Sequence, residues 1–153
     1  MAGVLIRELH DDEVRAAAEL RLLWDLENDV EPPISRDEFL DSAERWYRRN
    51  ASSHHCTVVV RDGAIVGMAW LAVIARVPTP RSVDRLSADV QSVYVIPAER
   101  NAGIGGRLLA AVLDRAWSLG AERVTVHSSA EALTVYERAG FAPSERLLQR
   151  YRP

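Results

Sequence analysis

The sequence predicts an α/β domain in which helices flank one central mixed, mostly antiparallel sheet, in the order β-α-α-β-β-β-α-β-α-β. Two observations support this fold class. Segments rich in β-branched residues, which favour strands, alternate along the chain with segments whose apolar residues recur at helical spacing. The chain has 153 residues, enough to bury one core, so we expect a single domain over residues 1–153.

The N-terminal third is expected to hold one strand and two helices. Residues 3–9 (Gly-Val-Leu-Ile-Arg-Glu-Leu) have the composition of a strand. Asp11 and Asp12 then offer N-cap side chains for a helix that runs to about residue 25. Ser35 and Glu38 form an S-x-x-E capping box, which predicts a second helix that ends near residue 50.

Three strands are expected in the middle of the chain. The dipeptide Asp62-Gly63 predicts a tight hairpin between residues 56–61 and residues 64–74. Gly67, inside the second of these strands, suggests a bulge. After a proline-containing loop, residues 86–95 are expected to form the third strand.

The C-terminal third is expected to add two helices and two strands. A long amphipathic helix ends at Gly120, which suits a left-handed C′ position, and residues 122–127 alternate as a strand does. Ser128 and Glu131 offer a second capping box for a short helix through residue 138. Residues 145–151 are expected to close the sheet as a last strand, whose exposed edge makes a homodimer possible.

The composition argues against several classes of protein. A net charge of -3 disfavours a nucleic-acid-binding surface, which usually needs a basic patch. No apolar run is long enough to span a membrane, and we find no secretory h-region. The single cysteine, Cys56, cannot form an intrachain disulfide, so we expect a reducing cytoplasm. No Cys/His cluster has zinc-site spacing, so no metal is expected.

The most informative stretch runs from Val93 to Leu109. Its β-branched and aromatic residues stop at Pro97, which cannot donate to a strand ladder. Glycines at positions 103, 105 and 106 then accompany the start of an amphipathic helix. The first N–H groups of a helix lack intrahelical partners, and the helix dipole places partial positive charge there. Because glycine lets a ligand approach the backbone and Arg100 adds a cation, this turn suits a phosphate or pyrophosphate.

Two other phosphate-binding motifs fit this stretch poorly. A P-loop requires Gly-Lys-Ser/Thr where Gly105-Gly106-Arg107 stands. A dinucleotide-binding fingerprint requires a third glycine where Leu108 stands. A nucleotide-binding domain is therefore disfavoured.

Two segments instead resemble one family. Val95-x-Pro97 followed by Arg100-x-x-Gly103-x-Gly105 resembles the acyl-CoA signature of the GNAT superfamily of N-acetyltransferases. Residues 132–141 (Ala-Leu-Thr-Val-Tyr-Glu-Arg-Ala-Gly-Phe) look like the A-x-x-L-Y-x-x-x-G-F segment of the same family. The predicted element order is also that of the GNAT fold, so the resemblance covers essentially the whole chain.

The resemblance implies binding sites for acetyl-CoA. Backbone groups of Val93 and Val95 would hydrogen-bond the pantetheine arm as an added strand does, and Arg100 would lie at the edge of the pyrophosphate. Ser129 stands where the family often has an asparagine that contacts the pantetheine, and its hydroxyl reaches less far. The N–H groups that would hold the pyrophosphate belong to Asn101, Ala102, Gly103, Ile104, Gly105 and Gly106.

The resemblance also implies catalytic roles. Tyr136 would lie near the sulfur of the cofactor and protonate the departing thiolate, because a phenol with a pKa of about 10 can share a proton with a thiolate. Asp89 is the first candidate for the base that removes a proton from the amine, and His127 is the second; either residue could instead be structural. The N–H of Val95 could polarise the thioester carbonyl.

The acceptor site is expected between the first two helices. Their connection holds four carboxylates, which would favour a cationic amine, although a solvated acidic loop explains them equally well. These residues are Asp25, Glu27, Asp29 and Glu31. Trp24, Trp46 and Trp70 could line the pocket or pack in the core.

The sequence therefore predicts a cytoplasmic, acetyl-CoA-dependent N-acetyltransferase. It would acetylate a primary amine of a small molecule or a peptide by direct attack in a ternary complex, without a metal. The alternative is a non-catalytic acyl-CoA-binding sensor or regulatory domain of the same fold. Tyr136 favours the enzyme, while Ser129 and the uncertain base keep the alternative open.

Overall fold

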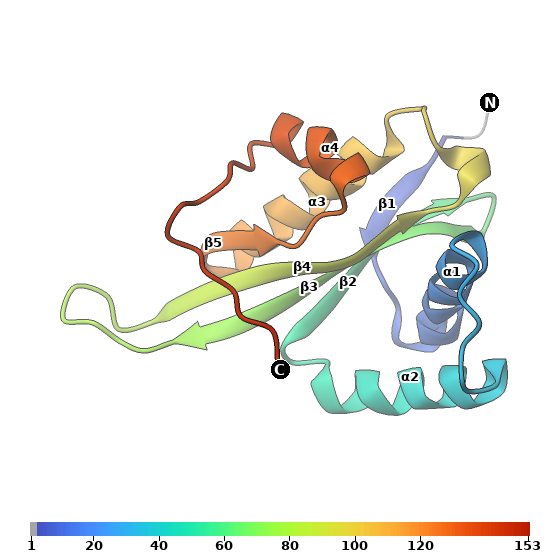
Figure 1. The fold of residues 1–153 in the computed structure, drawn as a ribbon, viewed down its shortest axis with the longest axis horizontal. Coiled ribbons are helices and arrows are strands. Elements are labelled where there is room, and N and C mark those ends of the chain that lie inside the picture. Colours follow the sequence, from blue (N-terminus) through green and yellow to red (C-terminus); the bar gives the residue numbers. More distant parts are fainter. Residues whose placement is uncertain (1–2) are drawn as a thin grey trace.

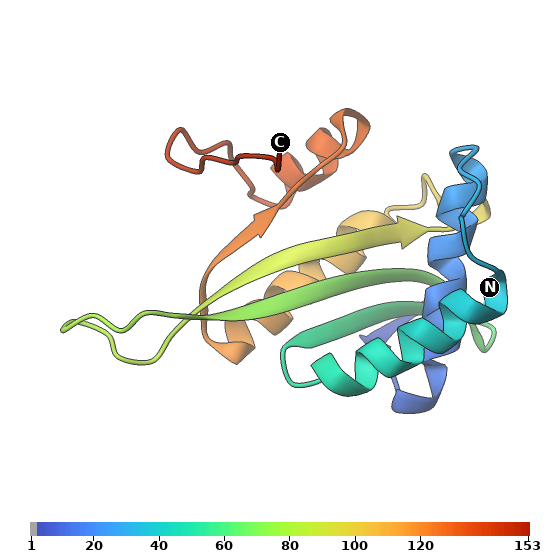
Figure 2. The same cartoon turned by 60° about the horizontal axis from the view of Figure 1, so that its bottom comes forward.

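The computed structural model describes residues 3–153, which form one five-stranded sheet with helices on both faces (Figures 1 and 2). The strands are β1 (Leu5–Glu8), β2 (His54–Arg61), β3 (Ala64–Arg76), β4 (Arg85–Val95) and β5 (Ala121–Val126). The helices are α1 (Val14–Glu27), α2 (Arg36–Asn50), α3 (Ile104–Leu119) and α4 (Leu133–Arg138). The strands lie in chain order and pair antiparallel, except for the parallel pair β4–β5, so the predicted mixed sheet is confirmed. None of these helices is long and apolar enough to cross a bilayer.

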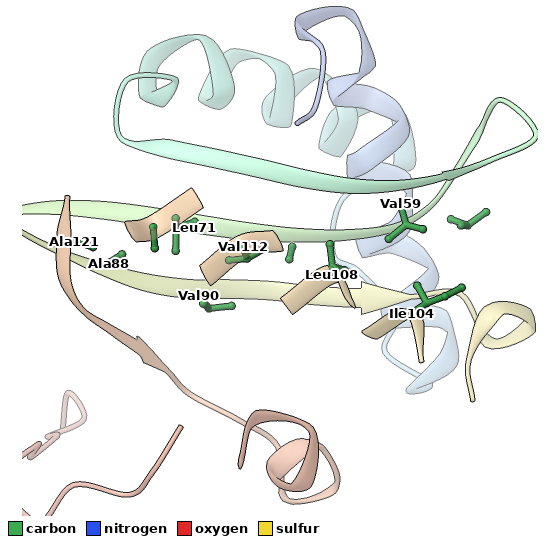
Figure 3. Packing of buried hydrophobic residues seen from close by; sticks show 11 residues of the cluster. Val59, Leu71, Ala88, Val90, Ile104, Leu108, Val112 and Ala121 are labelled. Atoms are coloured by element: carbon green, nitrogen blue, oxygen red, sulfur yellow. The ribbon is translucent and has the colours of Figure 1, made fainter. Parts of the chain in front are cut away.

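Two apolar clusters hold the helices to the sheet. On one face Leu108 and Val112 of α3 are almost completely buried against Leu71 and Val90 of the sheet (Figure 3). On the other face, α1 packs against the sheet through an apolar stripe that includes Val14, Ala17 and Leu20. That second cluster includes Val14, Ala17, Leu20, Val58, Met68 and Tyr94. The sheet is thus covered on both sides, and β4 contributes to both clusters.

The first two helices begin in different ways. Asp11 and Asp12 do not cap α1, as the sequence had suggested, because they lie in a short 3-10 turn that precedes it. There Asp11 accepts a hydrogen bond from the Tyr47 hydroxyl (2.6 Å). The capping box of α2 is confirmed: the Ser35 N–H donates to the Glu38 carboxylate (2.9 Å), and the Glu38 N–H donates to Ser35 Oγ (3.2 Å).

The C-terminal tail corrects two predictions. Residues 145–151 form no strand, so the element order ends with α4 and the homodimer built on that strand loses its basis. The tail does not alternate buried and exposed residues; it is exposed, and Leu148 retains 87% of its accessible surface. Ser128 and Glu131 do not form a capping box either, because the Ser128 hydroxyl donates to the Ser129 carbonyl instead (2.7 Å).

Two bulges shape the middle of the sheet. The predicted bulge at Gly67 is confirmed by the register, which shifts between Val59 and Val60 of the partner strand. A second bulge lies in β4: Tyr94 pairs with Met68 and Gln91 pairs with Trp70, so two residues of β4 oppose one of β3. The first of those two residues, Ser92, has a φ of 48°. This second bulge lies next to the clefts described below.

Candidate active site

A cleft of about 510 Å³ opens where the two parallel strands separate. The pairing of β4 with β5 ends at Val90 and Val126, and β5 then leads away from β4 toward α4 (Figure 2). Six of the residues predicted to bind the cofactor or to act in catalysis line this cleft: Val93, Val95, Arg100, Gly105, Ser129 and Tyr136. Segments distant in the sequence therefore meet here, although of the predicted pyrophosphate-binding residues 101–106 the lining includes Gly105 alone.

The glycine turn presents its backbone at one end of the cleft. Asn101 (φ 64°) and Gly103 (φ 74°) adopt left-handed conformations, which turn the chain into the start of α3. Gly105 and Gly106 form the first turn of that helix, and a Cβ at either position would meet no protein atom within 4 Å. Packing does not require these two glycines. Their small size leaves the N–H groups at the helix start open to an anion.

Arg100 is tied to α1 rather than left as an unpaired cation. Its Nη2 donates to Glu27 Oε2 (2.8 Å), its Nη1 donates to the other carboxylate oxygen, and its Nε donates to the Val95 carbonyl (2.8 Å). The Tyr94 hydroxyl donates to the same carboxylate (2.9 Å). Hydrogen bonds from Arg100 and then from Tyr94 lower the pKa of Glu27 to about 2. A carboxylate that the sequence assigned to the acceptor site thus lines this cleft. We call it the cofactor cleft, because its lining includes residues that the sequence assigned to the cofactor.

Tyr136 lies at the wall between the cleft and a second cavity. Its side chain is 9% exposed and packs edge-to-face on Phe141, with the ring centroids 5.5 Å apart. Burial raises the pKa of Tyr136 above its ordinary value. The phenol therefore stays protonated at neutral pH and can donate a proton.

The second cavity, of about 270 Å³, lies between the cofactor cleft and the space beneath the first two helices and shares lining residues with both. Val93, Ser129 and Tyr136 line both this cavity and the cleft. His127, which is exposed at the end of β5, and the bulge residue Ser92 also line it. We call it the junction cavity.

A third cavity, of about 360 Å³, lies between α1, α2 and the sheet. We call it the acceptor cavity. Most of its lining is apolar, and it includes Ala17, Phe39, Ala43, Trp46, Met68 and Trp70. Trp46 meets Trp70 edge-to-face at 5.5 Å, so two of the three tryptophans predicted for a pocket wall do line this cavity. Arg21, Met68 and Ser92 line both this cavity and the junction cavity, so the three spaces adjoin one another in series.

Asp89 lies outside these spaces. Its Oδ1 accepts from Thr125 Oγ1 (2.7 Å), and its Oδ2 accepts from Gln91 Nε2 (3.2 Å). Among the described residues that line the three cavities, Gln91 occurs and Asp89 does not. Tyr136 and His127 both line the junction cavity. Asp89 lines none of the three cavities and contacts Gln91, which lines the acceptor cavity.

The acidic connection does not line the acceptor cavity as expected. Asp25 lies 4.0 Å from Arg21, Glu27 faces the cofactor cleft, and Asp29 and Glu31 are exposed. Within the described chain, the cavity lining contains one charged side chain, that of Arg21. Sequence reasoning missed Arg21 because no motif marks it; the available signal was its position four residues after the buried Ala17, on the same face of α1.

This fold, with a glycine turn at one end of a cleft, agrees with the class of acyl-CoA-dependent transferases that the sequence resembles. The chain belongs to the Acetyltransferase (GNAT) family, which matches residues 17–141. It is accordingly an N-acetyltransferase whose acyl donor is acetyl-CoA.

Two relatives agree with this family in sequence. An uncharacterized N-acetyltransferase of Bacillus subtilis, YhfO, is 29% identical over 67% of this chain and 69% of its own length. The mycothiol acetyltransferase of Sanguibacter keddieii is 32% identical over 72% of this chain. The matched region spans only 34% of that longer protein.

Solved structures agree in fold. An acetyltransferase of Clostridium acetobutylicum, crystallised with acetyl-CoA, has a TM-score of 0.80 at 16% identity and covers 97% of this chain and 96% of its own. An acetyltransferase of Trypanosoma brucei has a TM-score of 0.72 at 27% identity, over 98% of this chain and 100% of its own.

Proposed function

We propose that this chain, acting as one domain, transfers the acetyl group of acetyl-CoA directly to a primary amine of a small molecule or a peptide in a ternary complex. The observation that carries the proposal is that the three cavities adjoin and share lining residues. Val93 and Tyr136 border both the cofactor cleft and the junction cavity, and Met68 and Ser92 border both the junction cavity and the acceptor cavity. Two substrates bound at the two ends would meet beside Tyr136, which supplies rate by proximity.

The cleft suits acetyl-CoA. The N–H groups around Gly103–Gly106 would hold the pyrophosphate, and the backbone of β4 at Val93 and Val95 would pair with the pantetheine arm. The Val95 carbonyl already accepts from Arg100, so this arm would share that acceptor or use Val93. Ser129 borders the same cleft and could donate its hydroxyl. When bound, acetyl-CoA supplies an activated thioester.

The residues of the junction cavity account for the proton transfers. A main-chain N–H beside the β4 bulge polarises the thioester carbonyl; Val93 borders both cavities and is better situated for this than Val95. His127 is the candidate to accept the proton of the amine, directly or through water, because it lines the cavity and an imidazole titrates near neutral pH. Asp89 acts at most as a positioning residue, through its hydrogen bond to Gln91. Tyr136 donates its proton to the leaving thiolate.

Calorimetry and a turnover assay test the proposal together. We expect acetyl-CoA and CoA to bind the folded protein with measurable heat, and free thiol to appear when a panel of primary amines is added. Binding without thiol release for any amine would favour the alternative, an acyl-CoA sensor. No heat with acetyl-CoA or CoA would rule out both functions.

A further inference from the structure

We infer that the acceptor is an α-amino acid with a large apolar side chain, and that Arg21 binds its carboxylate. The inference rests on the proposed function, because it specifies the acceptor of the same reaction. It replaces the cationic amine that the acidic connection had suggested.

The acceptor cavity suits an apolar body. Its volume of about 360 Å³ is large enough for a small ligand, and Phe39, Ala43, Trp46 and Trp70 give it an aromatic and aliphatic wall. No carboxylate lines it among the described residues, so nothing there would pair with the second charge of a polyamine. A hydrocarbon or aromatic side chain would be stabilised by its removal from water.

The single cation of that lining lies at one end of the cavity. Arg21 lines both the acceptor cavity and the junction cavity. The guanidinium carbon stacks 4.0 Å from the centroid of the Trp24 ring, which holds its planar face. The nearest carboxylate oxygen, on Asp25, is 4.0 Å away, beyond hydrogen-bond distance. N–H groups of Arg21 are therefore available to a carboxylate, which is the partner they bind best.

The cofactor gives Arg21 no comparable partner. In the proposed orientation the phosphates lie near the Gly103–Gly106 turn and Arg100, whereas Arg21 borders the other end, where the thioester and pantetheine carry no charge. An anion that accepts hydrogen bonds from Arg21 would then belong to the acceptor substrate.

The positions expected for the amine, the apolar body and the carboxylate of the acceptor lie next to one another. The amine must enter the junction cavity near Ser92 and Tyr136, the apolar body occupies the acceptor cavity, and Arg21 lies where these two spaces meet. An amine, a carboxylate and an apolar side chain on one carbon satisfy this arrangement. A peptide amine lacks the carboxylate at that position.

Four acceptors separate these features in the thiol-release assay: phenylalanine, phenylalanine amide, phenethylamine and spermidine. We expect kcat/KM for phenylalanine to exceed that of the other three by about 10–100-fold, the range expected for a hydrogen-bonded charge pair. Arg21→Gln should lower the phenylalanine value by a similar factor and leave phenethylamine within about twofold. Arg21→Lys should retain part of the preference. The matched control is Arg48→Gln, which changes an exposed arginine of α2 outside the cavity. It should change kcat/KM neither for phenylalanine nor for phenethylamine.

A second variant tests the apolar body separately. Ala43→Leu narrows the acceptor cavity, so it should reduce acetylation of tryptophan and phenylalanine more than that of alanine. Equal activity on phenylalanine and its amide, a preference for spermidine, or an equal loss on all acceptors in Arg21→Gln would overturn the inference while leaving the N-acetyltransferase intact. So would a protein that binds acetyl-CoA and acetylates none of the amino acids. A protein that does not bind acetyl-CoA would instead refute the proposed function.

Discussion

The two halves of the active site are built differently. In the proposed function, the cofactor cleft holds its ligand with main-chain groups at the β4 bulge and at the glycine turn, and the sequence already marks the glycine turn. The acceptor cavity is assembled from side chains of α1, α2 and the sheet, which no single segment specifies. A ligand shared by a whole family can be held by backbone geometry. A ligand particular to one member needs side chains, and these meet only after folding.

The largest expected effect is on kcat and comes from Tyr136, which lies between the cofactor cleft and the junction cavity. Tyr136→Phe removes the proton donor and keeps the ring packed on Phe141, so kcat should fall about 100-fold or more. The Kd for acetyl-CoA should stay within about twofold, since binding in this proposal relies on backbone groups. Steady-state kinetics and calorimetry measure the two quantities. An unchanged kcat would remove Tyr136 from the mechanism.

The backbone character of the cofactor half can be tested at the glycine turn. Gly105→Ala adds a methyl group that meets no protein atom within 4 Å, and alanine in a helix is favoured over glycine by about 1 kcal/mol. We expect Tm to rise or stay unchanged while acetyl-CoA affinity falls about tenfold. Thermal unfolding and calorimetry on the same preparation check this. Unaltered affinity would mean that the ligand does not approach this turn.

Glu27 belongs to α1 but contacts Arg100, so it links the two halves. Glu27→Gln removes a negative charge beside the proposed diphosphate site and loosens Arg100. Acetyl-CoA should then bind about two- to fivefold more tightly at low salt, and the gain should shrink as salt screens it. Glu31→Gln, in the exposed connection, is the control. Weaker binding in Glu27→Gln would mean instead that Glu27 positions Arg100 for the ligand.

The smallest expected effect is on stability in acid. Hydrogen bonds from Arg7 and Arg100 lower the pKa values of Glu13 and Glu27, respectively, to about 2, from an ordinary value of 4.5. Because the folded state holds these protons less tightly, both groups stabilise it above pH 4.5 and lose that contribution as the pH falls toward about 2. Urea unfolding between pH 6 and pH 3 should therefore show a decline that the double variant Glu13→Gln/Glu27→Gln reduces. An identical decline in the variant would assign it to other groups.

The same contrast explains which features the sequence could predict. The Ser35 capping box and the left-handed Gly120 depend on neighbouring residues, and the structure has both. Asp11 does not cap α1 because it lies in the 3-10 turn before that helix, where its carboxylate accepts a hydrogen bond from Tyr47, a residue far along the chain. The role of Arg21 depends on where α1 packs, which no local pattern specifies. The predicted last strand does not form because residues 145–151 pair with no other strand.

The bulge in β4 adds one residue, Ser92, that the fold of the strand does not require. Val90 and Val93 pack toward α3 and Tyr94 toward α1, while Gln91 and Ser92 both line the acceptor cavity. Removing Ser92 would restore plain alternation from Val90 to Val95 without moving any core side chain to the wrong face. A chain shortened by this one residue should fold with an uninterrupted ladder and be inert. At this strand the protein carries one residue more than a regular ladder needs, and in the proposed mechanism acetyl transfer depends on that residue.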